Sequence, residues 1–348
     1  MKNKLLIEKL NLTHSLDIEE YEYLIENYDE ESAELLRQYA VSAREKYYSN
    51  KVYVRGLIEI SNICKNDCYY CGIRKSNRNC ERYRLTKDDI LSCCDEGYAL
   101  GFRTFVLQGG EDGAFTDEVV CDIVSTIKRK YSDCAITLSL GERSKESYQK
   151  LYDAGADRYL LRHETADSVH YASLHPQEQT LQNRMQCLSD LKEIGFQVGC
   201  GFMVGSPYQK PEHIAQDLKF IEVFSPDMCG VGPFIPHKDT EFFDHLSGDV
   251  GLCCYILSII RLIKPNILLP ATTALGTVNS YGRIKGILSG ANVIMPNLSP
   301  LNVREKYSLY NGKVHTGVES AQLIEDLKTS MKAIGYEAVV DRGDIKKE

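Results

Sequence analysis

The sequence lacks the features of a membrane or secreted protein. Its longest apolar stretches fall well short of the ~18 residues that a membrane-spanning helix needs, and no apolar segment follows Met1-Lys-Asn-Lys, as a signal peptide would require. It also lacks an excess of positive charge. The formal net charge is −8, which excludes the basic surface typical of nucleic-acid-binding proteins. We therefore predict a cytoplasmic protein that binds neither membranes nor nucleic acid.

Internal linkers, low-complexity segments and blocks of like charge are also absent from the 348 residues. A single α/β barrel takes about 250 residues, with room for extensions. The absence of a linker favours one catalytic domain. We place it at residues 51–300, between an N-terminal helical extension at 1–50 and a C-terminal extension at 301–348 that packs on the barrel.

Cysteine, in contrast, is plentiful, with 13 residues in the chain. Most are scattered without metal-ligand spacing, as in the pairs Cys93–Cys94 and Cys253–Cys254. In a reducing cytosol we expect these to be reduced core residues and not disulfides. Their abundance fits an organism that rarely meets oxygen, and hence an anaerobic setting.

Three cysteines are closely spaced. Cys64, Cys68 and Cys71 form a CxxxCxxC pattern after Val52–Ile60, a segment typical of a strand ending in a loop. Thiolates are the ligands of iron–sulfur clusters, and three thiolates leave one iron of a four-iron cluster open. An open position distinguishes a catalytic metal site from a structural one. The pattern predicts an iron–sulfur cluster with room for a small molecule; a zinc site with Cys80 as fourth ligand is the alternative.

From residue 52 onwards, short apolar segments alternate with amphipathic helices. This alternation predicts a parallel sheet, and eight such units predict a complete (β/α)8 TIM barrel. The expected strands are Val52–Ser61, Thr104–Gln108, Ala135–Leu140, Arg158–Arg162, Gln197–Met203, Met228–Pro233, Ile267–Ala271 and Asn292–Met295. The expected helices are Thr86–Leu100, Asp117–Tyr131, Lys145–Ala154, Arg184–Ile194, Glu212–Val223, Gly251–Ile263 and Ile284–Leu288.

In such a barrel the active site forms at the C-terminal ends of the strands. Polar or glycine-rich segments follow every expected strand, which predicts a ligand in the mouth of the barrel. Structural interpretations of the same residues remain open. Glu164 can form an ion pair with Arg158 or Arg162, His163 can be a buried core histidine, and Thr272 can cap the next helix.

With Tyr70 before its last cysteine, the CxxxCxxC segment resembles the signature of radical S-adenosylmethionine (SAM) enzymes. The resemblance implies that the open iron chelates the amino and carboxylate groups of SAM. It further implies that an electron from an external donor, passed through the cluster, cleaves a carbon–sulfur bond and yields a 5′-deoxyadenosyl radical.

Longer segments resemble, more narrowly, the HydE family of FeFe-hydrogenase maturases. These segments are Cys64–Arg74 with Arg82–Arg84, Val106–Asp112, Thr137–Glu142, Asp157–Ala166, Gly232–His237, Pro270–Thr277 and Gly290–Asn297. The related biotin synthase and methylornithine synthase families share the barrel and the cysteine triad. The resemblance implies a complete radical SAM barrel, with the cluster and SAM near its top and a substrate cavity running inward.

The resemblance also implies residue roles. Cys64, Cys68 and Cys71 hold the cluster. The implied SAM contacts are Tyr70, Gly109, Gly110, Ser139, Glu164, Arg184, Met203 and Val231. The implied substrate contacts are Gln108, Thr137, Arg158, Thr272, Thr273 and Tyr307. Two of these roles make independent chemical sense, because a carboxylate such as Glu164 accepts from ribose hydroxyls and the guanidinium of Arg184 suits a carboxylate.

The implied reaction is a radical step on a small organometallic substrate, an iron complex carrying CO, cyanide and cysteine. The HydG maturase delivers this complex, and the product passes towards the HydF scaffold. Some HydE proteins bind a second cluster through three further cysteines after the Tyr-x-x-Tyr segment. Here Tyr307–Tyr310 is followed by none, so we expect a single 4Fe–4S cluster.

Two other functions remain open from the sequence. One is a methylornithine synthase or another small-molecule radical SAM mutase on the same barrel. The other is a non-enzymatic iron–sulfur carrier or sensor, which would not cleave SAM.

Overall fold

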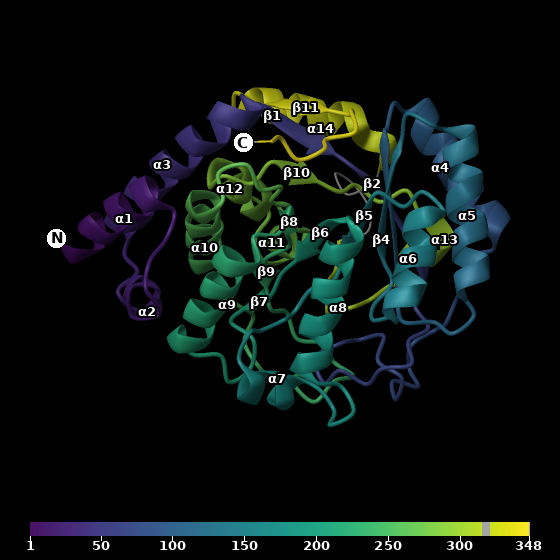
Figure 1. Ribbon diagram of the computed structural model, residues 1–348, viewed down its shortest axis with the longest axis horizontal. Coiled ribbons are helices and arrows are strands. Elements are labelled where there is room, and N and C mark those ends of the chain that lie inside the picture. Colours follow the sequence, from purple (N-terminus) through teal and green to yellow (C-terminus); the bar gives the residue numbers. More distant parts are fainter. Residues whose placement is uncertain (315–320, 348) are drawn as a thin grey trace.

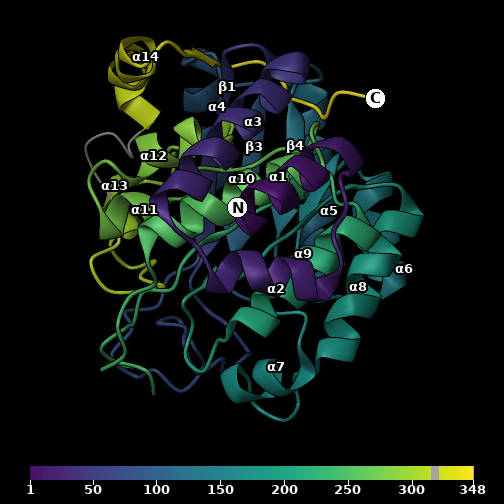
Figure 2. The same cartoon turned by 90° about the vertical axis from the view of Figure 1, so that its left-hand side faces the viewer.

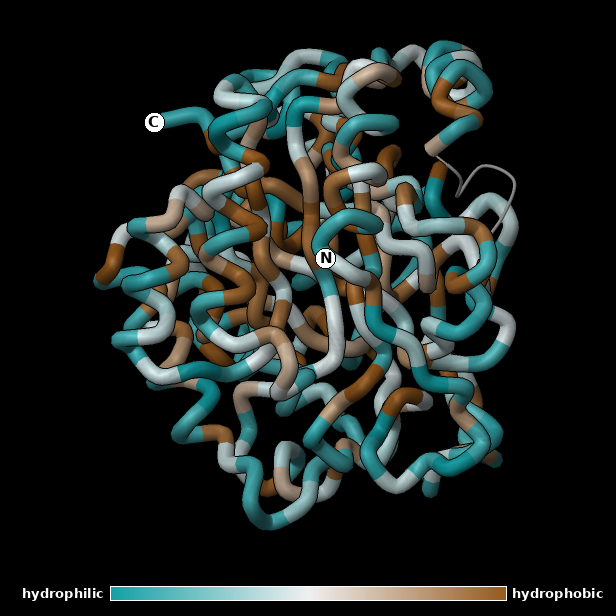
Figure 3. The backbone as a smooth tube through the Cα atoms, turned by 90° about the vertical axis from the view of Figure 1, so that its right-hand side faces the viewer, coloured by the Kyte–Doolittle hydropathy of each residue, from teal (hydrophilic) through white to brown (hydrophobic). Residues whose placement is uncertain are grey.

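The computed structural model describes residues 1–314 and 321–347. Strands form the interior of the molecule and helices surround them (Figure 1). Residues 315–320 and 348, part of the expected C-terminal extension, lie outside the described residues. Apolar segments gather in the interior and polar ones on the outer helices (Figure 3), the arrangement that helices on a buried parallel sheet require.

The interior is a parallel barrel. Its continuous sheet has six strands, in the order β2 (Gly56–Ser61), β3 (Thr104–Gly109), β4 (Ala135–Ser139), β5 (Arg158–Leu160), β6 (Gln197–Cys200) and β8 (Met228–Cys229). Three parallel bridges complete the circle, namely Met228↔Leu268, Pro270↔Val293 and Leu57↔Asn297. The predicted (β/α)8 barrel is therefore confirmed, and the expected strand Ile267–Ala271 is present through bridges alone.

The first expected strand is divided. Its first half, β1 (Lys51–Val54), pairs with β10 (Val293–Ile294) and with β11 (Glu337–Val339) from the end of the chain, whereas β2 pairs with β3. The division falls at Arg55, whose N–H still bonds the carbonyl oxygen of Ile294 at 2.9 Å. A strand of the C-terminal extension thus joins the barrel beside its first strand.

Two later strands are also divided, at Gly201 and Gly230. Beyond them, β7 (Met203–Val204) and β9 (Gly232–Pro233) form a separate parallel pair. Gly201 has a φ of 154°, and a Cβ placed on it would lie 2.1 Å from the carbonyl oxygen of Gly230. The two backbones approach so closely that only glycine fits at this point.

The barrel helices match the expected ranges to within three residues. They are α4 (Lys87–Ala99), α5 (Asp117–Lys130), α6 (Lys145–Asp153), α8 (Leu181–Ile194), α9 (Pro211–Phe224), α10 (Val250–Ile263) and α12 (Gly282–Leu288). Side-chain oxygens of the N-cap residues accept from the first turns of several helices; these residues are Thr86, Thr116, Ser144, Thr180 and Asp249. Three short helices were not predicted, α7 (Ser168–Leu174), α11 (Thr273–Val278) and α13 (Leu301–Arg304).

The N-terminal extension consists of α1 (Lys2–Thr13), α2 (Ile18–Glu26) and α3 (Glu30–Tyr48). These helices lie against α9 and α10 on the outside of the barrel (Figure 2). The Tyr21 hydroxyl donates to the carboxylate of Glu222 on α9 at 2.8 Å. Helix α10 is buried almost all round because α3 covers its outer side. The extension braces the barrel wall and contributes no residue to its mouth.

The C-terminal segment contains η2 (Ala321–Leu323), α14 (Ile324–Ala333) and β11, which Figure 1 shows beside β1 at the end of the barrel opposite α7. The chain then crosses the N-terminal ends of the barrel strands. There the carbonyl oxygen of Arg342 accepts from Thr104 at 2.8 Å and from Arg158 at 2.7 Å, and that of Gly343 accepts from Arg55 at 3.1 Å. The segment closes the bottom of the barrel.

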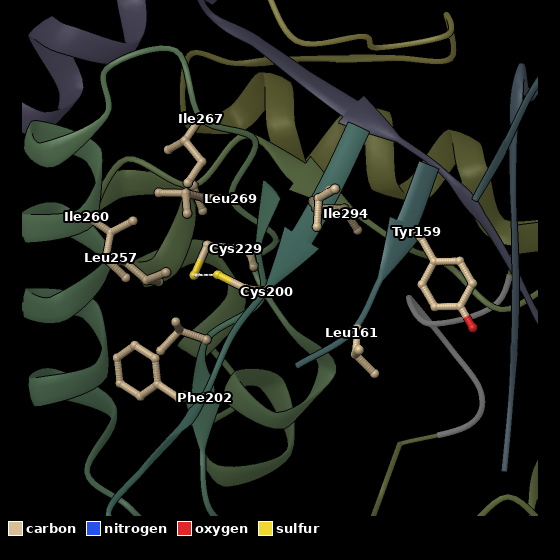
Figure 4. Packing of buried hydrophobic residues seen from close by; sticks show 14 of the residues in the cluster. Tyr159, Leu161, Cys200, Phe202, Cys229, Leu257, Ile260, Ile267, Leu269 and Ile294 are labelled. Carbon is tan, nitrogen blue, oxygen red and sulfur yellow. Dashed lines mark hydrogen bonds between the residues drawn. The ribbon is translucent and has the colours of Figure 1, made fainter. Parts of the chain in front are cut away.

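The scattered cysteines are free thiols, and most of them are buried in the core. Cys200 and Cys229, on neighbouring strands, have sulfurs 3.9 Å apart within the apolar cluster drawn in Figure 4. This agrees with the expectation of reduced core residues. The predicted domain boundaries at residues 50 and 300 stay a prediction, although β11 shows that the extension shares the barrel sheet.

Candidate functional site

A cavity of about 350 Å³ opens at the C-terminal ends of the barrel strands. It gathers side chains from loops far apart in the sequence, as the barrel geometry predicted. Most of the predicted site residues line it, namely Cys64, Cys68, Tyr70, Cys71, Gln108, Gly109, Gly110, Ser139, Glu164, Arg184, Met203, Thr272, Thr273 and Tyr307.

Three predicted contacts do not line the cavity. Thr137 lies inside β4, two residues before Ser139, and is buried beneath the cavity. The side chain of Val231 packs into the outer apolar core, while its neighbours Gly230 and Gly232 reach the cavity. Thr137 shares the strand face of Ser139 but lies one layer deeper in the barrel, whereas Val231 lies one residue away from the two glycines that reach the cavity, on the opposite face.

Arg158 is the largest correction. It begins β5 and is fully buried at the opposite end of the barrel. Its guanidinium forms an ion pair with Asp344 and donates to Thr104 at 3.2 Å. The arginine of this segment that lines the cavity is Arg162, four residues later, which forms an ion pair with Glu164 at 3.0 Å. Arg158 is therefore a structural residue of the barrel bottom and does not contact substrate.

This placement predicts the effect of Asp344→Ala. The change removes a charged partner from a buried guanidinium, so we expect a loss of about 2 kcal/mol in the free energy of unfolding, the range for a hydrogen bond to a charged group. Urea denaturation measures it. SAM affinity should stay as in wild type, since the site lies at the other end; a weaker affinity would contradict the assignment.

The three cysteines lie on one loop after β2 and all reach the cavity. Burial raises the pKa of the Cys68 thiol to about 12 and that of the Cys71 thiol well above its usual range. Thiolates at these positions need positive charge beside them, which iron ions supply. The backbone N–H of Glu111 already points at the Cys64 sulfur at 3.4 Å. The donor set fits a 4Fe–4S cluster.

The zinc alternative finds no support in the structure. Among residues 1–314 and 321–347, no three His, Cys, Asp or Glu side chains converge on one ion position. Cys80 does not line the cavity and lies instead 3.5 Å from the side-chain amide of Asn62. Three separated thiols suit a cluster, in which each sulfur binds a different iron.

Arg82 holds the cysteine loop in shape. Its guanidinium donates to four backbone carbonyls of the loop, those of Asn62, Ile73, Arg74 and Asn77, at 2.6 to 3.0 Å. A further hydrogen bond connects the loop to the C-terminal segment: the N–H of Gly72 donates to the carbonyl oxygen of Leu309 at 2.8 Å. The loop is thus ordered by contacts that do not use its thiols.

Gly110 brings the loop after β3 against the cysteine loop. A Cβ on Gly110 would lie 2.3 Å from the carbonyl oxygen of Ile63 and 2.9 Å from Cys64 Cβ. Only glycine permits this approach. The exposed backbone of Gly109 and Gly110 beside Cys64 is suited to a ligand that also touches the cluster.

Arg184 lies at the N-terminal end of α8 and reaches the cavity. It donates to the carboxylate of Glu142 at 2.5 Å, and Asn183 donates to the other oxygen of that carboxylate at 2.6 Å. Burial acts to lower the pKa of Arg184, but Tyr171 and Glu142 outweigh it and raise the pKa. The group stays a cation with a fixed orientation.

Tyr70 is held by a histidine that was not predicted. The ring nitrogen Nδ1 of His175 lies 2.9 Å from the carbonyl of Tyr171, so Nδ1 carries the proton. Its Nε2 then accepts from the Tyr70 hydroxyl at 3.2 Å. Neither His175 nor α7 carried a sequence signal, because their role depends on a contact across the cavity wall.

The inner end of the cavity holds a buried ion pair, Glu59 with Lys313, that was also missed. Lys313 further donates to the carbonyl of Tyr307 at 2.9 Å, and Asn297 donates to Glu59 at 2.9 Å. A single acid in the apolar run Val52–Ile60 was the available signal. Thr272 also lines the cavity; its hydroxyl has no partner among the residues that the structure describes and makes no helix cap.

The barrel, the cysteine loop and the cavity between them define the radical SAM class. Residues 58–221 match the family described as "Radical SAM superfamily". The chain is an iron–sulfur enzyme that cleaves SAM. No helix of the described residues has the length and apolar character to cross a bilayer.

Within that class the chain belongs to the HydE family. It is 44% identical over 281 residues, 81% of this chain and 80% of the relative, to "FeFe hydrogenase maturase subunit HydE" of Thermotoga maritima. It is 28% identical to "3-methylornithine synthase" of Methanosarcina acetivorans, over 82% of this chain and 81% of that protein.

Solved structures share the fold. Methylornithine synthase (PylB) superposes with a TM-score of 0.83, covering 96% of this chain and 97% of that chain at 24% identity. HydG, a maturase of the FeFe-hydrogenase, superposes with a TM-score of 0.81, covering 97% of this chain and 76% of that chain at 20% identity. At these identities the likeness concerns the barrel alone.

Proposed function

We propose that this enzyme acts in assembly of the diiron active site of FeFe-hydrogenase. The observation that carries the proposal is the 44% identity to the Thermotoga maritima maturase across 81% of the chain. The cavity supports it, since nearly all predicted SAM and cluster residues line one space. The lower identity of 28% to methylornithine synthase argues against that alternative.

Each part of the cavity has a proposed task. When bound, a 4Fe–4S cluster would supply the electron for the cleavage of SAM. Cys64, Cys68 and Cys71 hold the cluster, and the thiol count of this chain favours a single one, since no cysteine follows Cys254. Arg184 binds the carboxylate of SAM.

Glu164 is suited to the ribose. Its Oε2 is buried and has an ion contact with Arg162 but no hydrogen bond within the described part of the chain, so it keeps capacity to accept from a hydroxyl. The substrate space lies further in, at Gln108, Thr272, Thr273 and Tyr307. The substrate is an iron complex with CO, cyanide and cysteine supplied by HydG, and the product goes towards HydF.

Arg184→Ala should weaken SAM binding about 10–100-fold, because hydrogen bonds to charged groups contribute about 1.5–3 kcal/mol. Equilibrium dialysis with SAM measures this, and Arg184→Lys should restore part of the affinity. Arg143→Ala is the matched control, since Arg143 is also largely buried and pairs with Asp117 at 3.1 Å but lies outside the cavity. Equal SAM affinity in the two alanine variants would contradict the role of Arg184.

The test of the proposed function is anaerobic maturation of apo-hydrogenase in vitro with HydG, HydF and a one-electron donor. Hydrogenase activity should appear only when this protein is present with SAM. Formation of 5′-deoxyadenosine without any gain in hydrogenase activity would leave the SAM-cleaving class intact and overturn the pathway.

A further inference from the structure

Glu164 has an unusual backbone. Its φ is 67°, in the left-handed region, although it is not glycine. Such a conformation is strained for an L-residue and persists only where its surroundings fix it. It lies in the segment just after β5, which turns there so that the Glu164 carboxylate lines the cavity. Something must hold this segment in place.

A chain of hydrogen bonds on the side away from the cavity holds the segment around Glu164. The N–H of Glu164 donates to the carbonyl of Gly201 at 2.9 Å, and the N–H of Gly201 donates to Nδ1 of His163 at 3.2 Å. Nε2 of His163 lies 3.1 Å from Oδ1 of Asp217. The N–H of Ala166 donates to the same oxygen at 2.6 Å. One carboxylate on α9 thus anchors the backbone on both sides of Glu164.

The contacts assign the histidine tautomer. Because Nδ1 of His163 accepts a hydrogen bond, it carries no proton, and Nε2 must donate to Asp217. His163 is therefore neutral, in keeping with burial, which lowers its pKa to about 3. The expectation that His163 could be a buried, hydrogen-bonded core histidine agrees with this geometry.

The buried pair of His163 and Asp217 would lower the stability of the fold if its role were structural alone. His163 and Asp217 are both fully buried, and Oδ2 of Asp217 has no hydrogen-bond partner among the described residues. An unsatisfied buried oxygen of a carboxyl group lowers stability, and an apolar pair of similar volume is often at least as stable. Neither residue lines the cavity, so neither touches SAM or substrate.

We propose that His163 and Asp217 are positioning residues that hold the strained segment around Glu164 and so direct its carboxylate at the ribose of SAM. This inference rests on the proposed contact between Glu164 and SAM. The new element is that the contact between Glu164 and SAM depends on two buried residues outside the cavity. One of them, Asp217, belongs to α9.

Asp217→Ala tests the inference on the reconstituted protein. SAM affinity, measured by equilibrium dialysis, should fall about tenfold, the low end of the 10–100-fold loss seen when hydrogen-bond partners behind metal-binding residues are removed. Hydrogen exchange of the segment 161–166 should become faster. Asp217→Asn retains Oδ1 as acceptor and should keep most of the affinity; it and His163→Asn remain usable if the alanine variant does not fold.

Ser258→Ala is the matched control. Ser258 is also buried and donates to the carbonyls of Cys254 and Ser289, at 3.2 and 3.0 Å, away from the cavity. Its loss should lower the thermal midpoint without changing SAM affinity. If Asp217→Ala behaved like this control, the pair would be merely structural and the inference wrong.

A double-mutant cycle with Glu164→Gln separates the inference from the proposed function. If Asp217 acts through Glu164, the double variant should bind SAM about as weakly as Glu164→Gln alone. If Glu164→Gln bound SAM as wild type does, the proposed SAM contact would fail and the inference with it. If Glu164→Gln weakened SAM binding and Asp217→Ala did not, the inference would be overturned and the proposed SAM contact would stand. The same would hold if the losses of SAM affinity in the two single variants added in full in the double variant.

Discussion

Replacing Cys68 by alanine is expected to abolish reductive SAM cleavage while the barrel remains folded. Cys68 lines the cavity together with Cys64 and Cys71, and a cluster held by two thiolates has lost a third of its protein ligands. The loop itself should keep its shape, because Arg82 ties its carbonyls without using the thiol. Anaerobic assay of 5′-deoxyadenosine, together with iron content and circular dichroism, measures the three parts of this expectation.

Cys80→Ala provides the control for that result. Cys80 belongs to the same stretch of chain and is partly exposed, but it does not reach the cavity. Iron content and 5′-deoxyadenosine formation should equal those of wild type. If the Cys80 variant lost its metal, or if Cys68→Ala still produced 5′-deoxyadenosine at the native rate, the assignment of the cluster ligands would be wrong.

The second large effect concerns stability. Lys313→Met is expected to lower the free energy of unfolding by about 3–5 kcal/mol, the usual result when one partner of a buried ion pair is removed. Glu59 has no exposed surface, and the variant would remove Lys313 as a donor and leave the hydrogen bond from Asn297 to its carboxylate. Urea denaturation of the anaerobic protein measures the loss.

Two further variants sharpen this test. Adding Glu59→Gln to Lys313→Met removes the uncompensated charge and should recover much of the lost stability. Lys306→Met is the matched control, since Lys306 pairs with Glu81 on the surface and such pairs contribute about 0–1 kcal/mol. Equal losses for Lys306 and Lys313 would show that burial of the Glu59 pair carries no special energy.

The barrel and its mouth could be predicted because they follow from local patterns. Apolar segments, capped helices and glycines recur in order along the chain, and a parallel barrel brings the ends of its strands together. The position of a residue along its strand is harder to predict. Arg158 and Arg162 belong to one segment, yet one lies at the bottom of the barrel and the other at the cavity.

Contacts between distant segments escaped prediction for a different reason. Glu59 meets Lys313, His163 meets Asp217, and Tyr70 meets His175 only after the barrel has closed. No periodicity or spacing connects such partners in the sequence. A buried acid in an apolar strand indicates that a cation lies near, but it does not say which one.

The closure of the barrel bottom by the end of the chain has a consequence for synthesis on the ribosome. At ~5–20 residues per second, the first strand emerges long before β11, its partner. Until then the edge of β1 and the guanidinium groups of Arg55 and Arg158 lack the backbone that later covers them. A nascent chain halted before residue 337 should therefore be recognised by chaperones as unfinished, however complete its cysteine loop already is.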